Sequence, residues 1–417
     1  MAATKRLARR TAAATFIAAI ATVTGCAAPA AAHSSPAAHA SPARPAPRAR
    51  PPGAASQSRT TATTVASSSP DPVRDYLSAA SCVGGTFCVA AGSNFGTGRS
   101  LAERWNGRTW RVMDGSGVTT RLSSVSCPST SFCMAVGNRS AQLWDGTRWW
   151  AVKTPRGAES DVLAVSCATR TYCLAVGPWA AQVWNGVSWR PVPLPRPALG
   201  FTSVACLTRS FCLAVGSQAS HEGTVSRSRA LAWNGRTWRA TRPPSAGRFA
   251  ALAGVSCSRP AGSGRSSRLA GRTRPSCVAV GWRGHCHQPP QPLGQRCFFS
   301  LRWDGTGWTE LPSPAATPLA ASVSCGSATG CLAVGDCNLT ASCRGAAALA
   351  LRGLAWRPHL AVAPGGPGSS LEGVACWRRT ACIATGGAVH SSGALVTLVE
   401  AWNGLRWRVL PTLSPAG

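Results

Sequence analysis

Six segments of the chain share one pattern, in which Asn-Gly or Asp-Gly stands between two tryptophans. They are WNGRTW at 105–110, WDGTRW at 144–149, WNGVSW at 184–189, WNGRTW at 233–238, WDGTGW at 303–308 and WNGLRW at 402–407. Asn-Gly and Asp-Gly are strong signals for a tight β-hairpin. With a two-residue type I′ turn, Trp105 would face Arg108, and Trp110 would lie opposite Glu103 on the same sheet face as Trp105. We interpret the indoles as packing between sheets; stacking on sugars is the alternative.

A second motif, centred on Cys, divides the chain into seven units. Its members are Cys82, Cys127, Cys167, Cys206, Cys257, Cys325 and Cys376, between 39 and 68 residues apart. A period near 40 residues is typical of propellers and solenoids. Each unit contains four short runs rich in β-formers, as in LSSVSC, FCMAVG, AQLW and RWWAVK of the second. The sequence therefore predicts an all-β fold, a seven-bladed β-propeller of four-stranded antiparallel blades. Unit six keeps Trp356 but has Leu351 in place of the first Trp.

The nineteen cysteines predict one hairpin disulfide per blade. The expected pairs are Cys82–Cys88, Cys127–Cys133, Cys167–Cys173, Cys206–Cys212, Cys257–Cys277, Cys325–Cys331 and Cys376–Cys382. Cys286–Cys297 and Cys337–Cys343 would then close two longer loops. Zinc at His285-Cys286-His287 is the alternative, but the C-x2-C spacing of zinc ribbons is absent, so no metal or other cofactor is predicted. An oxidising compartment favours disulfides.

The N-terminal region predicts export. A basic stretch, KRLARR, precedes an apolar run that is short for a membrane helix, and Val23-Thr24-Gly25-Cys26 resembles the bacterial lipobox. That resemblance implies a signal over 1–25, a lipid anchor on Cys26 and a place on the outer face of the cytoplasmic membrane. An ordinary cleavable signal, with secretion, is the alternative. Residues 26–74 are Ala/Pro/Ser-rich and are expected to be a disordered tether, with the propeller over 75–417.

The candidate ligand-binding residues lie in the loops between the second and third strands of units four to seven. Those loops share one face with the links between blades, and long loops on a rigid scaffold commonly bind ligands. The candidates are His221, Glu222, Arg227, Arg229, Trp282, Arg283, His285, Asp336, Asn338 and His390. The alternative is that the ring merely tolerates variable loops. An Arg-rich insertion at 258–276 is expected on the opposite face.

The recurring S-C-x5-C-x-A-V-G followed by W-[ND]-G-x-x-W resembles exported actinobacterial propeller proteins, and more distantly kelch and Asp-box propellers. The resemblance covers about 75–417 and implies the architecture rather than an activity. We expect a monomeric, non-catalytic binding or scaffolding lipoprotein that recognises a glycan, a cell-wall polymer or a partner protein. A secreted polysaccharide hydrolase or lyase is the enzyme alternative. Against it, the chain has only Tyr76 and Tyr172, and its acids show no recurring pair, although Glu222, Asp336 and Glu372 could converge in space.

The formal charge of +30 allows a third function, non-specific binding of polyanions. An Arg-rich composition also fits a GC-rich genome. No recognition helix is evident, so sequence-specific binding of nucleic acid is not expected. The sequence leaves open how the ring closes, either by packing of the last blade on the first or by a clasping strand from 60–74.

Overall fold

The computed structural model describes residues 74–113, 120–137, 139–155, 161–195, 200–219, 226–247, 249–258, 274–284, 296–314, 319–340, 343–361 and 368–412. These residues form 28 strands in seven four-stranded antiparallel sheets, which confirms the predicted fold class. Within these ranges, no helix is long and apolar enough to cross a bilayer. The predicted signal, Cys26 and nearly all of the tether lie outside the described residues.

Each blade follows the order of the chain, from an innermost first strand to an outermost fourth strand. Blade 1 comprises β1 (Asp75–Cys82), β2 (Cys88–Asn94), β3 (Ser100–Trp105) and β4 (Trp110–Val112). Blade 2 comprises β5 (Ser124–Ser129), β6 (Phe132–Gly137), β7 (Ser140–Trp144) and β8 (Trp149–Val152). Blade 3 comprises β9 (Ala164–Thr169), β10 (Tyr172–Val176), β11 (Ala181–Trp184) and β12 (Trp189–Pro191).

The later blades keep this plan with longer strands. Blade 4 comprises β13 (Gly200–Thr208), β14 (Phe211–Ala219), β15 (Ser226–Trp233) and β16 (Trp238–Ala240). Blade 5 comprises β17 (Ala250–Ser258), β18 (Ser276–Arg283), β19 (Cys297–Trp303) and β20 (Trp308–Glu310). Blade 6 comprises β21 (Leu319–Ser327), β22 (Gly330–Thr340), β23 (Cys343–Arg352) and β24 (Ala355–Leu360). Blade 7 comprises β25 (Ser370–Arg378), β26 (Ala381–Val389), β27 (Leu395–Trp402) and β28 (Trp407–Leu410).

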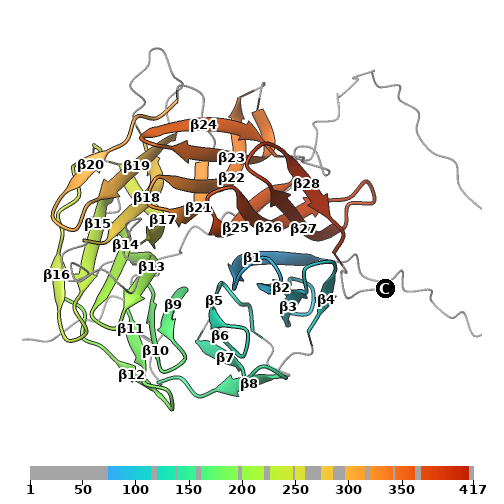
Figure 1. Ribbon diagram of the computed structural model, residues 1–417, viewed down its shortest axis with the longest axis horizontal. Coiled ribbons are helices and arrows are strands. Elements are labelled where there is room, and N and C mark those ends of the chain that lie inside the picture. The colour runs from blue at the N-terminus through green and yellow to red at the C-terminus, as the bar shows by residue number, and fades with distance from the viewer. Residues whose placement is uncertain are drawn as a thin grey trace, which may run out of the picture. The chain divides into compact units, whose positions relative to one another are not determined.

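The blades are arranged as a ring, with the first strands around the axis (Figure 1). Seven hydrophobic clusters lie between them, and each cluster joins one blade to the next. A small sheet has two apolar faces, and stacking on both neighbours removes both faces from water. The ring therefore supplies the core that a single blade lacks.

The cysteine and tryptophan motifs meet in one row across each blade. In blade 1, Cys82 pairs with Cys88, Cys88 with Trp105, and Trp105 with Trp110. All seven predicted blade disulfides are present, with Cα–Cα distances of 3.9–4.1 Å. Cys286 and the side chains of Cys337 and Cys343 fall outside the described residues, so the other two pairs stay predictions. Blade 6 has Leu351 opposite Trp356 in the same row.

The predicted hairpin register was wrong, although the indoles do pack between blades. Trp105 lies opposite Trp110, not opposite Arg108, and the ring centroids are 5.7 Å apart. The Asn106 Oδ1 accepts the backbone N–H groups of Arg108 and Thr109, both at 2.9 Å. Because this side chain satisfies two loop donors, the turn uses four residues, of which only Gly107 has a positive φ. Asp145 and Asp304 act in the same way, which explains why Asn and Asp alternate in the motif.

The glycine of the A-V-G motif is required by a close backbone approach. A Cβ at Gly177 would lie 1.9 Å from the Asp161 carbonyl oxygen, and the equivalent position in every blade lies 1.7–2.2 Å from such an oxygen. These glycines are Gly92, Gly137, Gly177, Gly216, Gly281, Gly335 and Gly386. Any side chain there would push the first strand away from the second.

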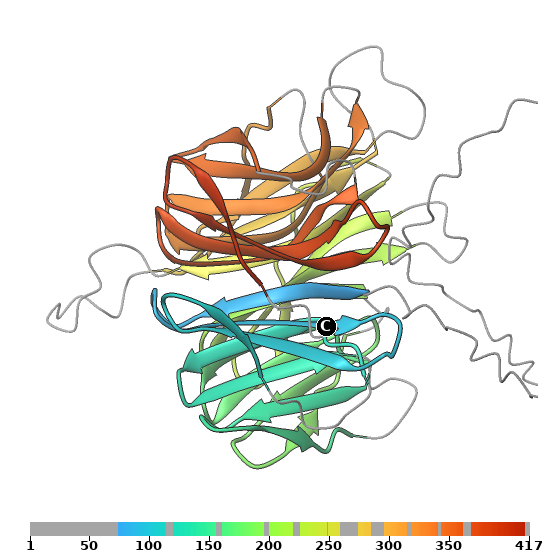
Figure 2. The same ribbon diagram turned by 90° about the vertical axis from the view of Figure 1, so that its right-hand side faces the viewer.

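Blade 7 packs directly against blade 1, which confirms one of the two routes considered for ring closure. Figure 2 shows β1 beside the strands of blade 7, where Leu77 meets Ile383 and Val399 in one cluster. Arg74 also forms a single parallel bridge with Leu395 of β27. Residues 60–73, the alternative clasp, lie outside the described part of the chain.

The closing interface also buries two carboxyl groups of blade 1. Asp75 and Glu103 are fully buried, and the Asn94 Nδ2 donates to the Asp75 Oδ1 at 2.8 Å. Burial raises the pKa of Asp75. Burial also raises the pKa of Glu103 to about 8, helped by the charge of Asp75 and opposed by a hydrogen bond from Thr397 in β27. The interface that closes the ring is therefore sensitive to protonation.

Candidate functional site

The two faces of the ring differ in what they carry. The first and third strands of every blade end at one face of the ring. This face holds the row of disulfides and tryptophans and the two hairpins of each blade, and we call it the lower face. The opposite, upper face carries the loops between second and third strands and the links between blades, because Asp75 at the start of β1 pairs with Asn94 at the end of β2. The described strand ends that flank the predicted candidates therefore lie on the upper face.

The structure gives several of the predicted residues structural partners. The Arg229 Nε donates to the Gln218 Oε1 at 2.8 Å, and buried Arg283 forms a 2.8 Å ion pair with Glu310. Arg296 lies over the Trp282 ring at 4.2 Å. Arg229, Arg283 and Trp282 therefore make contacts within blades 4 and 5. They are less available to a ligand than the sequence suggested.

The other candidates differ in how far the structure describes them. Arg227 and His390 are exposed, and the His390 Nδ1 lies 3.3 Å from the Ser392 hydroxyl. Asp336 is half-buried at the end of the part of β22 that pairs with β21. His221, Glu222, His285 and the side chain of Asn338 lie outside what the structure describes.

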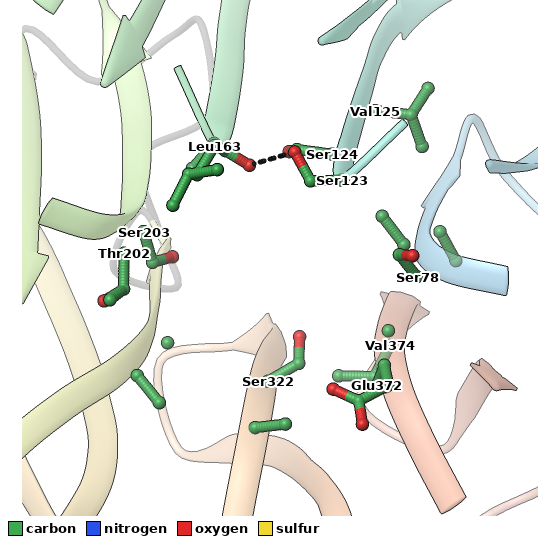
Figure 3. Close-up of a pocket in the computed structure, with 17 residues that line it drawn as sticks. Ser78, Ser123, Ser124, Val125, Leu163, Thr202, Ser203, Ser322, Glu372 and Val374 are labelled. Carbon is green, nitrogen blue, oxygen red and sulfur yellow. Dashed lines mark hydrogen bonds between the residues drawn. The ribbon is translucent and has the colours of Figure 1, made fainter. Parts of the chain in front are cut away.

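A cavity of about 160 Å³ lies on the ring axis, and all seven first strands line it. The residue four positions before each first cysteine faces it. These residues are Ser78, Ser123, Leu163, Thr202, Ala253, Ala321 and Glu372, several of which appear in Figure 3. In five blades a β-bulge leaves this residue out of the ladder, which re-aims its side chain toward the axis. The fixed spacing from the cysteine was the sequence signal that could have identified this set.

Hydroxyl groups of the cavity wall tie neighbouring blades together. The Ser123 Oγ donates to the Leu163 carbonyl oxygen at 2.9 Å, and the Thr202 Oγ1 donates to the Leu252 carbonyl oxygen at 2.7 Å. Glu372 occupies the same place in blade 7 and is the only charged residue among those that line the cavity.

Glu372 belongs to a small polar cluster at the closing interface. The Tyr76 hydroxyl lies 3.0 Å from the Ser370 Oγ and also hydrogen-bonds Glu372. Burial raises the pKa of Glu372, and the charge of Asp336 raises it further. Burial likewise raises the pKa of Asp336 and, together with the charge of Glu372, that of Tyr76. The acids Asp336 and Glu372 thus do converge in space, as the sequence left open.

This cluster favours hydrogen bonding over nucleophilic chemistry. A nucleophilic tyrosine needs a lowered pKa, whereas Tyr76 is held as a neutral phenol. Tyr172 is also occupied, because its hydroxyl accepts the Trp233 Nε1–H at 2.7 Å. Among the described residues, no group of three or more His, Cys, Asp or Glu side chains could hold a metal ion.

Exposed aromatic side chains on the upper face were missed by the sequence analysis. Trp179 lies in the β10–β11 loop and is 48% exposed, while the motif tryptophans of the same blade, Trp184 and Trp189, are buried. Phe95 lies in the β2–β3 loop, next to Tyr76 and with Arg121 over its ring at 4.6 Å. The sequence gives no loop-length signal for Trp179, because the loop that contains it is short.

Comparisons with known proteins add little beyond this geometry. No family model matches the chain, and no curated protein matches it. Among solved structures, "YCF48 bound to D1 peptide" is 13% identical, covers 73% of this chain and 84% of its own, and has a TM-score of 0.45. The Pan2 WD40 domain of Neurospora crassa is 12% identical over 82% of this chain and 91% of its own, with a TM-score of 0.48. The computationally designed Ika8 protein is 10% identical over 82% of this chain and 88% of its own, with a TM-score of 0.46.

Proposed function

We propose that the protein is a non-catalytic binding scaffold of the cell envelope that takes a wall glycan on its upper face. The observation that carries the proposal is Trp179, a half-exposed indole on a short loop of a rigid ring. The motif indoles are explained by blade packing, and Trp179 is not. A large aromatic side chain has few rotatable bonds, so it loses little conformational entropy when a ligand stacks on it.

The polar cluster of Tyr76, Ser370, Asp336 and Glu372, which we call the axial cluster, supplies polar groups at the upper ends of its strands. Asp336 and Glu372 accept hydrogen bonds when ionised and can also donate when protonated, and their raised pKa values keep the protonated form present at higher pH. Sugar hydroxyl groups both donate and accept, so they fit such a cluster. The export signal and lipid anchor expected from the first 26 residues would hold this face in the envelope.

A binding assay with two matched tryptophan variants tests the proposal. Trp179→Ala removes the indole of the upper face. Trp150→Ala removes an indole that is 43% exposed on β8, where Arg148 already covers its ring at 3.5 Å. The protein is sedimented with purified wall polysaccharide at about 0.05 and 0.5 M salt.

The two variants should behave differently. Wild-type protein should bind saturably at both salt concentrations, since stacking on an indole is insensitive to ionic strength. Trp179→Ala should weaken binding about tenfold or more, and Trp150→Ala should leave it unchanged. Equal binding by wild type and Trp179→Ala, or no binding of polysaccharide by wild type, would contradict a glycan site on this face.

A hydrolase or lyase is the second candidate, favoured only by the pairing of Asp336 with Glu372. The same incubation tests it, because cleavage would release soluble reducing ends or unsaturated sugars. Glu372→Gln would abolish that release.

A further inference from the structure

Five of the seven fourth strands carry an arginine at the same position of the repeat. The residue after the second motif tryptophan is arginine in five of the seven blades, at Arg111, Arg190, Arg239, Arg357 and Arg408. All five are exposed, and each stands on the outermost strand of its blade. We call these five residues the rim arginines. Because the blades repeat around the axis, the rim arginines are distributed around the outside of the ring.

The rim arginines form no ion pair with any carboxylate that the structure describes. Only two ion pairs occur among the described residues, Arg139–Asp161 and Arg283–Glu310, and neither includes a rim arginine. The described acids are used elsewhere: Asp75 and Glu103 are buried at the closing interface, and Asp145 and Asp304 bind their own hairpins. The positive charge of the rim is therefore uncompensated within the part of the chain that the structure describes.

One rim arginine, Arg111, stands where repulsion from a second arginine destabilises the sheet locally. Arg111 lies directly opposite Arg104 on β3, and Arg108 stands at the tip of the same hairpin. Like charges directly opposite each other destabilise a sheet. Protection of an exposed edge strand needs a single charge rather than a facing pair, so edge protection alone does not account for this arrangement. An anion between the two guanidinium groups would turn the repulsion into attraction.

We propose that the rim arginines form a docking surface for a linear polyol-phosphate polymer of the cell wall. A polymer that carries one phosphate per unit can meet several rim arginines in succession as it follows the outside of the ring. Arginine suits phosphate because its planar guanidinium can donate two parallel hydrogen bonds to two phosphate oxygens. The blade disulfides fit an oxidising compartment outside the cytoplasm, where such wall polymers occur and intracellular nucleic acid does not.

This surface is separate from the proposed glycan site. The rim lies on the fourth strands, whereas Trp179 and the axial cluster lie on the upper face. Binding to the rim depends on charge, and stacking at Trp179 does not. Each proposal can therefore fail without the other.

The test compares two variants that lose the same charge. The rim variant replaces Arg111, Arg190, Arg239, Arg357 and Arg408 by Gln. The control variant replaces five exposed arginines on loops, hairpins and the upper ends of strands, namely Arg99, Arg170, Arg227, Arg242 and Arg378. None of the ten forms an ion pair with another described residue. Thermal melting shows that both variants fold, and titration of poly(glycerol phosphate) over about 0.05–0.3 M salt measures binding.

We expect wild type to bind with an affinity that falls steeply with salt. The rim variant should lose at least about 100-fold in affinity at the lowest salt, and its log–log salt slope should become shallower by about 3, as expected when four or five phosphate contacts disappear. The control variant should keep most of the wild-type slope. Equal losses in the two variants would mean that net charge alone drives binding and would overturn the proposal, as would failure of wild type to bind.

Two further ligands decide the source of the anion. Polyglutamate presents carboxylates at similar density, and vesicles with anionic phospholipid present phosphate on a surface. Binding of polyglutamate or vesicles with a loss in the rim variant as large as that for poly(glycerol phosphate) would overturn the assignment to a polyol-phosphate polymer.

Discussion

The Ser81 Oγ in blade 1 accepts a 2.9 Å hydrogen bond from the backbone N–H of Cys127 in blade 2. The same bond joins Ser126 to Cys167, Ser166 to Cys206, Ser256 to Cys325 and Ser324 to Cys376. The serine of the S-C motif thus links the first strand of one blade to the first strand of the next. Two blades have alanine instead, Ala205 in blade 4 and Ala375 in blade 7. The second of these lies at the closing interface.

Replacing Ala375 by Ser should stabilise the ring. The new hydroxyl would stand where it can accept from the Cys82 N–H, and a hydrogen bond of this kind contributes about 1 kcal/mol. The free energy of unfolding, measured with urea, should rise by that amount in Ala375→Ser. Ser324→Ala, which removes the equivalent bond one blade earlier, should lower it by a similar amount. A destabilised Ala375→Ser would show that the closing blades are too close, or too far apart, for this bond.

Gly177→Ala should be among the most damaging single-methyl changes in the chain. The added Cβ would overlap the Asp161 carbonyl oxygen, and neither backbone can move without opening the first two strands of blade 3. We expect a loss of about 3 kcal/mol or more in the free energy of unfolding. Gly307→Ala is the control, because nothing lies within 4 Å of a Cβ at that position and its φ is unremarkable for an L-residue. Similar stabilities for the two variants would refute the close approach.

The repeats made the number of blades and the order of their strands predictable. The register of the hairpins was not predictable, because it depends on local side-chain hydrogen bonds. The cysteine spacing fixed the number of blades, because each pair closes one hairpin whatever the neighbouring blades contain. The hairpin register could not be obtained in the same way. The same sequence fits two kinds of turn. Asn106 could adopt a positive φ in a two-residue turn, or its side chain could accept two N–H groups in a longer turn, as it does in the structure. The strand registers of these two turns differ by two residues.

The site was less predictable because it depends on contacts between blades. Glu372 and Tyr76 are nearly 300 residues apart in the chain and meet only because the ring closes between them. Glu103 reads as an ordinary strand acid in SLAERW, and its burial follows from the packing of blade 7 over it. Long loops drew attention to Arg229 and Arg283, whereas Trp179 on a short loop is the more accessible side chain.

Removing one blade disulfide should cost stability without changing the blade count. The Cys167–Cys173 bridge closes a small loop, so loss of its constraint on the unfolded chain is worth about 2 kcal/mol. The double variant Cys167→Ser with Cys173→Ser should therefore unfold at lower urea and retain the β-sheet circular dichroism of the wild type. Peptide mapping without reductant should find the other blade pairs unchanged. Crossed pairs between blades would contradict the row of cysteines and tryptophans.

The stability of the ring should fall as the pH rises, because of Glu103. Its pKa is about 8 in the folded protein and 4.5 for an ordinary glutamate, so the folded state prefers the neutral acid. A group with a raised folded pKa contributes fully below pH 4.5, and its contribution is lost as the pH rises through about 8. Glu103→Gln keeps the shape of the neutral acid but cannot ionise. Asp75, the charged neighbour, remains in both proteins, so the difference between wild type and variant isolates Glu103.

Melting curves of wild type and Glu103→Gln should therefore diverge with pH. Near pH 4.5 the two proteins should have similar stability. Toward pH 9 the variant should become the more stable by a few kcal/mol, because a buried carboxylate at the closing interface is then present only in the wild type. Parallel curves over this range would mean that the Glu103 carboxyl group reaches water, and that the interface between blades 7 and 1 opens more readily than its packing indicates.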